Sequence, residues 1–181
     1  MRSRNLENTE RFGDTDNRRR KRSDGGYSIV ELIIVIAIIA VIVAAVSYSI
    51  VMIFSANAKA CANNLQRAVN DCKVTAMGKA DASLEIYGQD GKVYSRMTVD
   101  GVAQEPQKIG TNKVSVTCEK DGSAVKDISA GDSVTITFDR SAGSFTEATT
   151  DAFDTIVIAG GHREYELKLI RLTGKTELKL R

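Results

Sequence analysis

Glu31 is the residue whose type and position most suggest chemistry in this sequence. It immediately precedes an apolar stretch in which residues 32–58 carry no charge and residues 32–46 have no polar side chain. A charged group costs about 2.5 to 3.5 kcal/mol in the middle of a membrane and less near its surface. A carboxylate at the edge of this stretch therefore indicates a function, and pairing with a cation is the chemistry available to it.

The apolar stretch, residues 27–54, is long enough to cross a bilayer as a helix, which takes about 20 apolar residues. A basic run, Arg18–Arg22, lies just before it, and basic residues beside a membrane helix stay in the cytoplasm. We therefore expect one pass through the cytoplasmic membrane, with the N-terminus inside. The same run also fits a nucleic-acid or nuclear-type patch, but its place beside this helix favours the topological role.

The residues around Glu31 resemble the class III signal of type IV prepilins and type II secretion pseudopilins. The shared order is a basic cluster, Gly26, an aromatic residue at Tyr27, a small polar residue, two aliphatic residues, Glu31, a leucine and a long apolar helix. The resemblance implies that prepilin peptidase cuts after Gly26 on the cytoplasmic side and N-methylates Tyr27. Residues 1–26 would then be a polar leader that is removed, and Glu31 would be the fifth mature residue.

Such a cut has an electrostatic consequence for the start of the helix. It frees an α-amino group at Tyr27, where the helix macrodipole disfavours a positive charge. Glu31 is about one turn further on and can neutralise that charge in its own chain or, as the resemblance implies, in a neighbouring subunit. In a low dielectric this pair selects one register. Glu31 is therefore the predicted assembly residue of a helical filament built by head-to-tail stacking.

Two other interpretations of the apolar stretch stay open. An ordinary secretory signal would be cut at Ala56-Asn57-Ala58, although its apolar region usually has only about 7 to 15 residues. A plain single-pass anchor is the second, but it has no use for a carboxylate at Glu31.

The charge balance does not indicate a nucleic-acid partner. The chain has 25 basic and 23 acidic residues, and residues 1–26 hold eight of the basic and five of the acidic ones. Subtraction leaves 17 basic and 18 acidic residues, so the mature chain has a formal charge of −1. At 181 residues there is room for one domain beside the membrane helix.

The helix is predicted to continue beyond the membrane to Met77. No Gly or Pro lies between Tyr27 and Met77, and Gly78 is a natural stop. Residues 27–54 would form a membrane or filament-core half, and residues 55–78 an amphipathic half. Steps of three and four define the apolar stripe of the second half: Ala58, Cys61, Leu65, Ala68, Val69, Cys72 and Ala76.

The chain departs from the pilin pattern within this helix. Many type IV pilins have a proline at the position of Tyr48 and a helix breaker near that of Ala40, and this sequence has neither. No residue therefore marks a place for a kink. Whether the helix bends in a filament stays an open question at this point.

Residues 79–181 alternate between short apolar runs and turn signals, which predicts an extracytoplasmic antiparallel β domain. Its predicted strands are 83–87, 93–99, 113–119, 133–139, 153–158, 165–172 and 176–180. Their apolar faces can pack on the helical stripe to form one core. The predicted fold class is α+β and pilin-like, a long N-terminal helix packed on an antiparallel β-sheet domain.

The predicted closing hairpin carries a second resemblance. A strand ending in Thr173-Gly174-Lys175, with a short last strand after it and a Val-Thr-Ile-Thr-Phe strand before it, is similar to the GspH/FimT group of minor pilins. Thr-Gly-Lys is also an ordinary hairpin turn. Because some FimT-like minor pilins act in DNA uptake, the resemblance offers a DNA-binding alternative, in which phosphates are contacted by basic residues. The candidate contacts are Arg163, Lys168, Arg171 and Lys175, which fit a solvated sheet face equally well.

Three cysteines allow one bridge at most. Cys61 and Cys72 are about 16 Å apart along the helix, and disulfide Cα atoms lie within about 7 Å. Cys118 lies on the strand face predicted to turn toward the helix. In an oxidising compartment we expect a bridge between Cys72 and Cys118, with Cys61 and Cys118 as the alternative. Three buried thiols are an equally open interpretation.

The sequence has no motif of an enzyme. It lacks Gly-x-Ser-x-Gly, His-Glu-x-x-His and a phosphate-binding loop. Its only histidine, His162, fits a loop at a strand start, and without a Cys-x-x-Cys pair we expect no metal or other cofactor.

These observations predict a structural subunit, major or minor, of a type IV pilus or a type II secretion-like pseudopilus. Its partners would be other pilin subunits, prepilin peptidase, the membrane and the pilus assembly platform. The mature subunit would lie in a filament at the cell surface or across the periplasm.

Overall fold

One helix forms nearly all of the first described stretch of the chain. The computed structural model describes residues 26–78 and 80–181. Helix α1 (Ile29–Met77) is a continuous α-helix with no interruption at Ala40 or Tyr48. The prediction of one helix ending at Met77 is confirmed. The chain divides into two units, one up to Ala40 and the other Val41–Arg181.

Within the second unit, α1 buries one stripe of mostly small side chains. The buried residues are each at most 1% exposed: Ala58, Cys61, Ala62, Leu65, Val69, Cys72 and Ala76. Steps of three and four place most of them on one face, as predicted. Two residues differ from the predicted stripe: Ala62, which was not in it, belongs to the core, and Ala68, which was, is only partly buried. Because Ala and Cys side chains are short, strands can approach this face of the helix closely.

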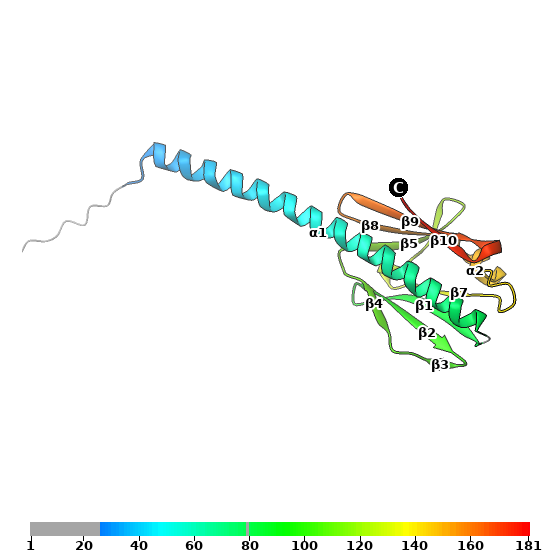
Figure 1. The fold of residues 1–181 in the computed structure, drawn as a ribbon. Helices are drawn as coiled ribbons and strands as arrows, with labels where there is room; N and C mark the ends of the chain where they lie inside the picture. Colours follow the sequence, from blue (N-terminus) through cyan, green and yellow to red (C-terminus); the bar gives the residue numbers. More distant parts are fainter. Residues whose placement is uncertain (1–25, 79) are drawn as a thin grey trace, which may run out of the picture. The chain divides into compact units, whose positions relative to one another are not determined.

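Within residues 80–181, ten strands form two antiparallel sheets (Figure 1). The first sheet has the order β3-β2-β1-β7, with β4 also paired to β2, and the second has the order β10-β9-β8-β5-β6. The strands are β1 (Ala82–Gln89), β2 (Lys92–Val99), β3 (Val102–Ala103), β4 (Gln107–Gly110), β5 (Ser115–Lys120), β6 (Ser123–Asp127), β7 (Ser133–Thr137), β8 (Thr155–Gly160), β9 (Arg163–Ile170) and β10 (Lys175–Leu180). The short helices are η1 (Ile128–Ala130), α2 (Glu147–Ala152) and η2 (Arg171–Thr173).

The predicted antiparallel β domain is confirmed, and seven of these strands match predicted ones within a few residues. The structure adds that the strands form two sheets. The pairing of β7 with β1 and of β8 with β5 joins strands that are distant in the chain, and a hydrophobic pattern does not reveal such partners. The prediction also omits β3, β4, β6 and α2. β3 has two residues, β4 has four, and every residue of β6 is exposed, so none shows the alternation that marks a strand.

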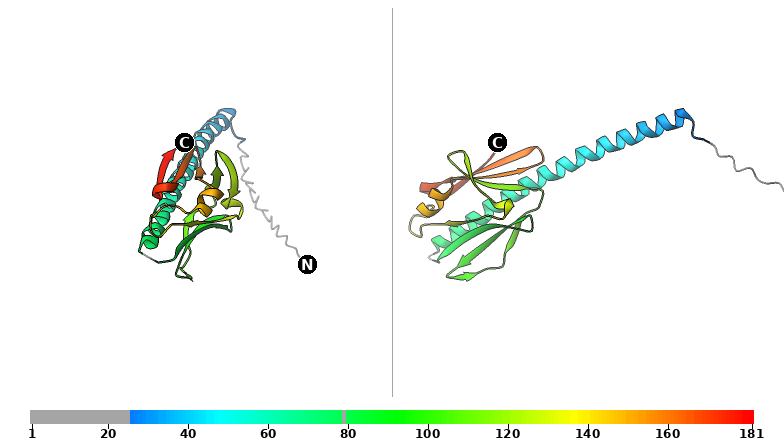
Figure 2. Two further views of the ribbon diagram at one scale, coloured as in Figure 1. Left: turned by 90° about the vertical axis from the view of Figure 1, so that its right-hand side faces the viewer. Right: turned by 180° about the vertical axis from the view of Figure 1, so that it is seen from behind.

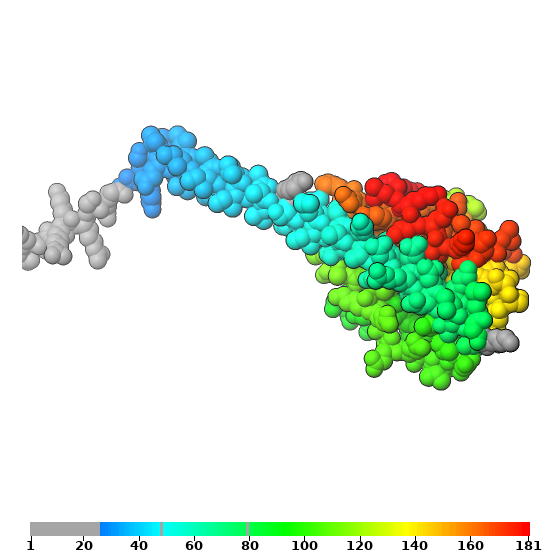
Figure 3. Space-filling model, in the orientation of Figure 1, coloured from blue at the N-terminus to red at the C-terminus, as the bar shows by residue number. Residues whose placement is uncertain are grey.

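Both sheets contribute to one core cluster with α1. The first sheet supplies Leu84, Ile86, Val93, Val134 and Ile136, and the second supplies Val116, Ile156, Ile158, Leu167 and Leu169. Figures 1 and 2 show the two sheets on either side of the second half of α1, and Figure 3 shows this half between β10 and the region of β4. The structure therefore confirms a single core shared by helix and strands.

The shared core gives a stability prediction for Leu65. This side chain is fully buried, so Leu65→Ala removes apolar contacts and leaves a cavity. We expect the free energy of unfolding to fall by about 2 to 5 kcal/mol. The exposed neighbour provides the control, because Asn64→Ala should change stability by less than about 0.5 kcal/mol. Denaturant unfolding of the full chain in detergent, followed by the near-ultraviolet circular dichroism of its tyrosines, measures both. Equal midpoints would contradict the shared core.

Candidate processing and assembly site

The first turn of α1 fixes where the helix begins. The amide of Leu32 donates to the carbonyl oxygen of Ser28 at 3.0 Å, and the amide of Val30 donates to Ser28 Oγ at 3.3 Å. Ser28 is therefore the N-cap of the helix. Residues 26–28 are not helical, so the Gly26–Tyr27 bond lies outside the helix, two residues before its first turn.

Ser28 is a residue whose role the sequence analysis did not identify. Its signal was available, because Ser28-Ile29-Val30-Glu31 has the Ser-x-x-Glu spacing of a capping box. The same spacing places Glu31 in the first turn of the helix. One short motif therefore defines both the start of the helix and the position of its carboxylate.

Gly26 and Tyr27 are open to a partner. Tyr27 is 80% exposed. A Cβ added to Gly26 would meet no atom within 4 Å, and Gly26 does not have a positive φ. Neither packing nor backbone conformation in the described structure calls for a glycine at this position.

Glu31 is placed to pair with a cation at the start of the helix. Its side chain is exposed, and it lies in the first turn, where the macrodipole stabilises a negative charge. Four residues separate it from Tyr27, about 6 Å of rise if the helix extends that far. An amine on Tyr27 is thus within reach from the same chain, and the exposed carboxylate is equally accessible to the amine of another molecule.

The surface that follows Glu31 is apolar over many turns. Large side chains from Leu32 to Ile53 are exposed, most of them by more than half. The hydroxyls of Ser47 and Ser49 donate to the carbonyl oxygens of Val43 and Ala45, so these polar groups have partners within the helix. Among the described residues, α1 is the one helix whose length and composition suit a membrane span.

Comparison with known families identifies this segment. Residues 21–47 match the family model of the prokaryotic N-terminal methylation motif. The chain carries a type IV pilin signal. The matched range contains Gly26, Tyr27, Ser28 and Glu31 and is followed by the rest of the apolar helix. No match was found among curated proteins, and none among solved structures.

The three cysteines are free thiols in the structure, and all three are buried. No disulfide links the three cysteines in the described structure, so the bridge from Cys72, or alternatively Cys61, to Cys118 stays a prediction. Burial raises the pKa of Cys61 and Cys118 to about 12 and that of Cys72 to about 11. Since the thiolate is the reactive form, these side chains act as small apolar members of the core.

The four candidate DNA contacts do not gather on one surface. Arg163 and Lys168 are five positions apart on β9, so their side chains point to opposite faces of the sheet. Arg171 makes an ion pair with Glu147 of α2, and Lys175 is exposed at the start of β10. This arrangement lends no support to DNA binding.

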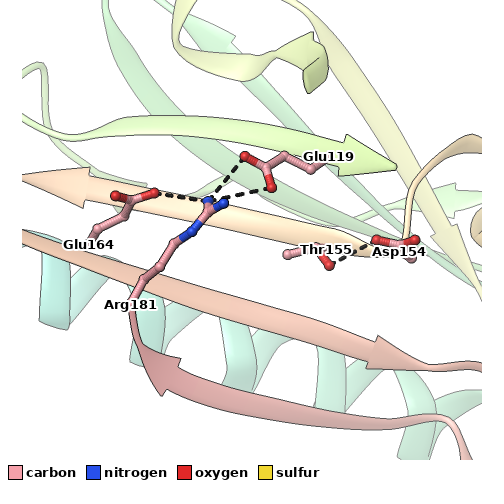
Figure 4. A network of polar contacts seen from close by, with 5 residues as sticks. All are labelled: Glu119, Asp154, Thr155, Glu164 and Arg181. Atoms are coloured by element: carbon pink, nitrogen blue, oxygen red, sulfur yellow. Dashed lines mark hydrogen bonds and ion pairs between the residues drawn. The ribbon is translucent and has the colours of Figure 1, made fainter. Parts of the chain in front are cut away.

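Acidic residues accompany the cations on the outward face of β9 and β10. Lys168 lies opposite Glu177 in the strand register. Arg181 contacts both Glu119, at 3.2 Å, and Glu164, at 3.0 Å (Figure 4). Such alternation of charge describes a solvated sheet face. Among residues 26–78 and 80–181, no three His, Cys, Asp or Glu side chains could together hold a metal ion.

Burial of the thiols predicts slow alkylation in the folded protein. With pKa values of about 11 to 12, Cys61, Cys72 and Cys118 are protonated at pH 8. Iodoacetamide at pH 8 should therefore leave the native chain unmodified and add three groups after unfolding without reductant. Intact-mass spectrometry counts the adducts. A single adduct after unfolding would show that two cysteines had been oxidised to a disulfide.

Proposed function

We propose that this chain is a structural subunit of a type IV pilus or a related pseudopilus, matured by prepilin peptidase after Gly26. The observation that carries the proposal is the register of Gly26, Tyr27 and Glu31 at the start of an exposed apolar helix, within a matched methylation motif. Gly26 is exposed and fits this role. A residue without a side chain lets a peptidase approach the backbone closely.

Assembly then depends on the charge that cleavage creates. The new amine of Tyr27 is a cation at a helix N-terminus, an unfavourable place. Pairing with Glu31 of a neighbouring subunit neutralises both charges, and the apolar helices cover each other. Misaligned helices would leave the two charges unpaired in an apolar setting, which makes the pair selective for one stagger.

The proposal assigns a role to each segment. Residues 1–26 are the cytoplasmic leader, residues 27–54 the membrane and filament-core half of the helix, residues 55–78 its amphipathic continuation, and residues 79–181 the extracytoplasmic domain. The basic run before the helix supports an orientation with the N-terminus inside.

The mature N-terminus tests the proposed processing. We expect mass spectrometry of the protein from its native membrane to show a chain that begins with N-methylated Tyr27. A chain beginning at Lys59 would mean ordinary secretion, and an intact Met1 would mean an uncut anchor. Either result would refute maturation after Gly26.

A substitution at Glu31 tests the assembly step separately. Glu31→Gln keeps the side-chain shape and removes the charge, and leaving one partner of a buried pair alone costs about 3 to 5 kcal/mol. We expect cleavage to proceed while the yield of sheared filaments falls more than about tenfold, since 1.4 kcal/mol corresponds to a factor of ten.

The matched control is Glu105→Gln, which removes an exposed carboxylate from the β domain and should leave filament yield unchanged. Wild-type yield with Glu31→Gln would remove Glu31 from the mechanism.

A further inference from the structure

We propose that the end of the β domain next to the apolar half of α1 binds anionic phospholipid headgroups. The contact is made by three cations, Lys59, Lys113 and Arg163, together with the ring of His162. We call these four residues the headgroup cluster. The proposal rests on the proposed membrane-anchored state of the subunit before assembly. It adds a lipid-binding surface on the domain to the anchoring helix.

The level of the membrane surface follows from the length of the apolar segment. A span of about 20 residues that begins at Leu32 ends near Val51. The turn between β8 and β9 packs at this level, because the amide of His162 donates to Ser55 Oγ at 3.4 Å. A Cβ on Gly161 would lie 2.7 Å from the Val51 carbonyl oxygen. The turn is thus held against the helix where the hydrocarbon would end.

The headgroup cluster surrounds this contact. Lys59, His162 and Arg163 line a hollow of about 410 Å³, together with Val51, Met52, Ser55 and Ala56. Lys113 Nζ lies 5.7 Å from the centre of the Phe54 ring, beside the same turn of α1. The hollow therefore has apolar side chains of the helix at its floor and two cations at its rim, Lys59 on α1 and Arg163 on β9. This combination suits a phosphate group attached to an acyl chain.

The three cations of this cluster have no acidic partner among the described residues: Lys59, Lys113 and Arg163 form no ion pair there. Arg181, by contrast, has two. No acidic residue occurs on α1 between Leu32 and Asn70.

Acidic residues in neighbouring segments of the β domain mostly have partners of their own. Glu164 pairs with Arg181, and Asp127 and Asp132 accept hydrogen bonds from backbone amides around η1. Asp90 stands in the β1–β2 turn with Lys92 two residues on. Anionic headgroups are therefore the complementary ligand beside the helix.

Hydrogen–deuterium exchange of the full chain in lipid nanodiscs tests the proposal. We compare discs of phosphatidylcholine alone with discs that also contain phosphatidylglycerol. The amides of the β8–β9 turn and of residues 111–114 should exchange several-fold more slowly in the anionic discs. The difference should vanish at 1 M salt, where the Debye length is about 3 Å.

Two triple variants make the test specific. Lys59→Gln, Lys113→Gln and Arg163→Gln together should abolish the difference between discs. The control removes three cations elsewhere, Arg140→Gln, Lys168→Gln and Lys175→Gln, and should retain it. Equal exchange of the wild-type chain in both discs, or a difference that survives the first triple variant, would overturn the lipid contact. Failure to insert into either disc would instead refute the membrane anchoring on which it rests.

Discussion

The exposed apolar surface of α1 is the constraint on which the rest of the molecule depends. From Ile29 to Ile50 the helix presents large apolar side chains that are exposed in the described structure. Soluble monomers rarely expose apolar patches of this extent, so a bilayer or other apolar helices have to cover it. From Ala58 onward the same helix is covered by its own domain. The change from one apolar environment to the other occurs within about one helical turn.

The carboxylate of Glu31, at the beginning of that surface, matters because of the same constraint. A surface without polar features would allow neighbouring helices to slide, since each axial offset buries similar area. Glu31 changes this, because a carboxylate in an apolar setting is costly unless it meets a cation. Ser28 contributes because it fixes the residue at which the helix begins, which leaves Tyr27 outside the regular hydrogen-bond ladder. Cap and carboxylate together give the apolar surface a defined polar beginning.

The features that could be predicted from the sequence are those with a local periodic cause. The absence of Gly and Pro before Gly78 predicted one helix, and the spacing around Leu65 predicted its buried face. The arrangement of two sheets could not be predicted, because the pairing of β8 with β5 depends on contacts between distant segments. The pairing of the cysteines could not be predicted for a related reason, because the sequence places Cys118 on a buried strand face but does not give its distance from Cys72. The candidate DNA contacts Arg163 and Lys168 lie on the same strand, β9, but their side chains point to opposite faces of the sheet.

The lack of a proline at Tyr48 has a more specific consequence once the packing is known. Gly160 and Gly161 fit against α1 so closely that a Cβ on either would lie within 3 Å of a helix carbonyl oxygen, at Phe54 and Val51. The helix is therefore held by the domain from Val51 onward, and any bend is confined to residues before that point. In that segment Ser47 and Ser49 donate their hydroxyls to carbonyl oxygens one turn earlier. Such bonds slightly weaken and bend helices, whereas a proline would remove a backbone bond outright. The serines thus permit gentle curvature above the domain without the break that a proline would introduce.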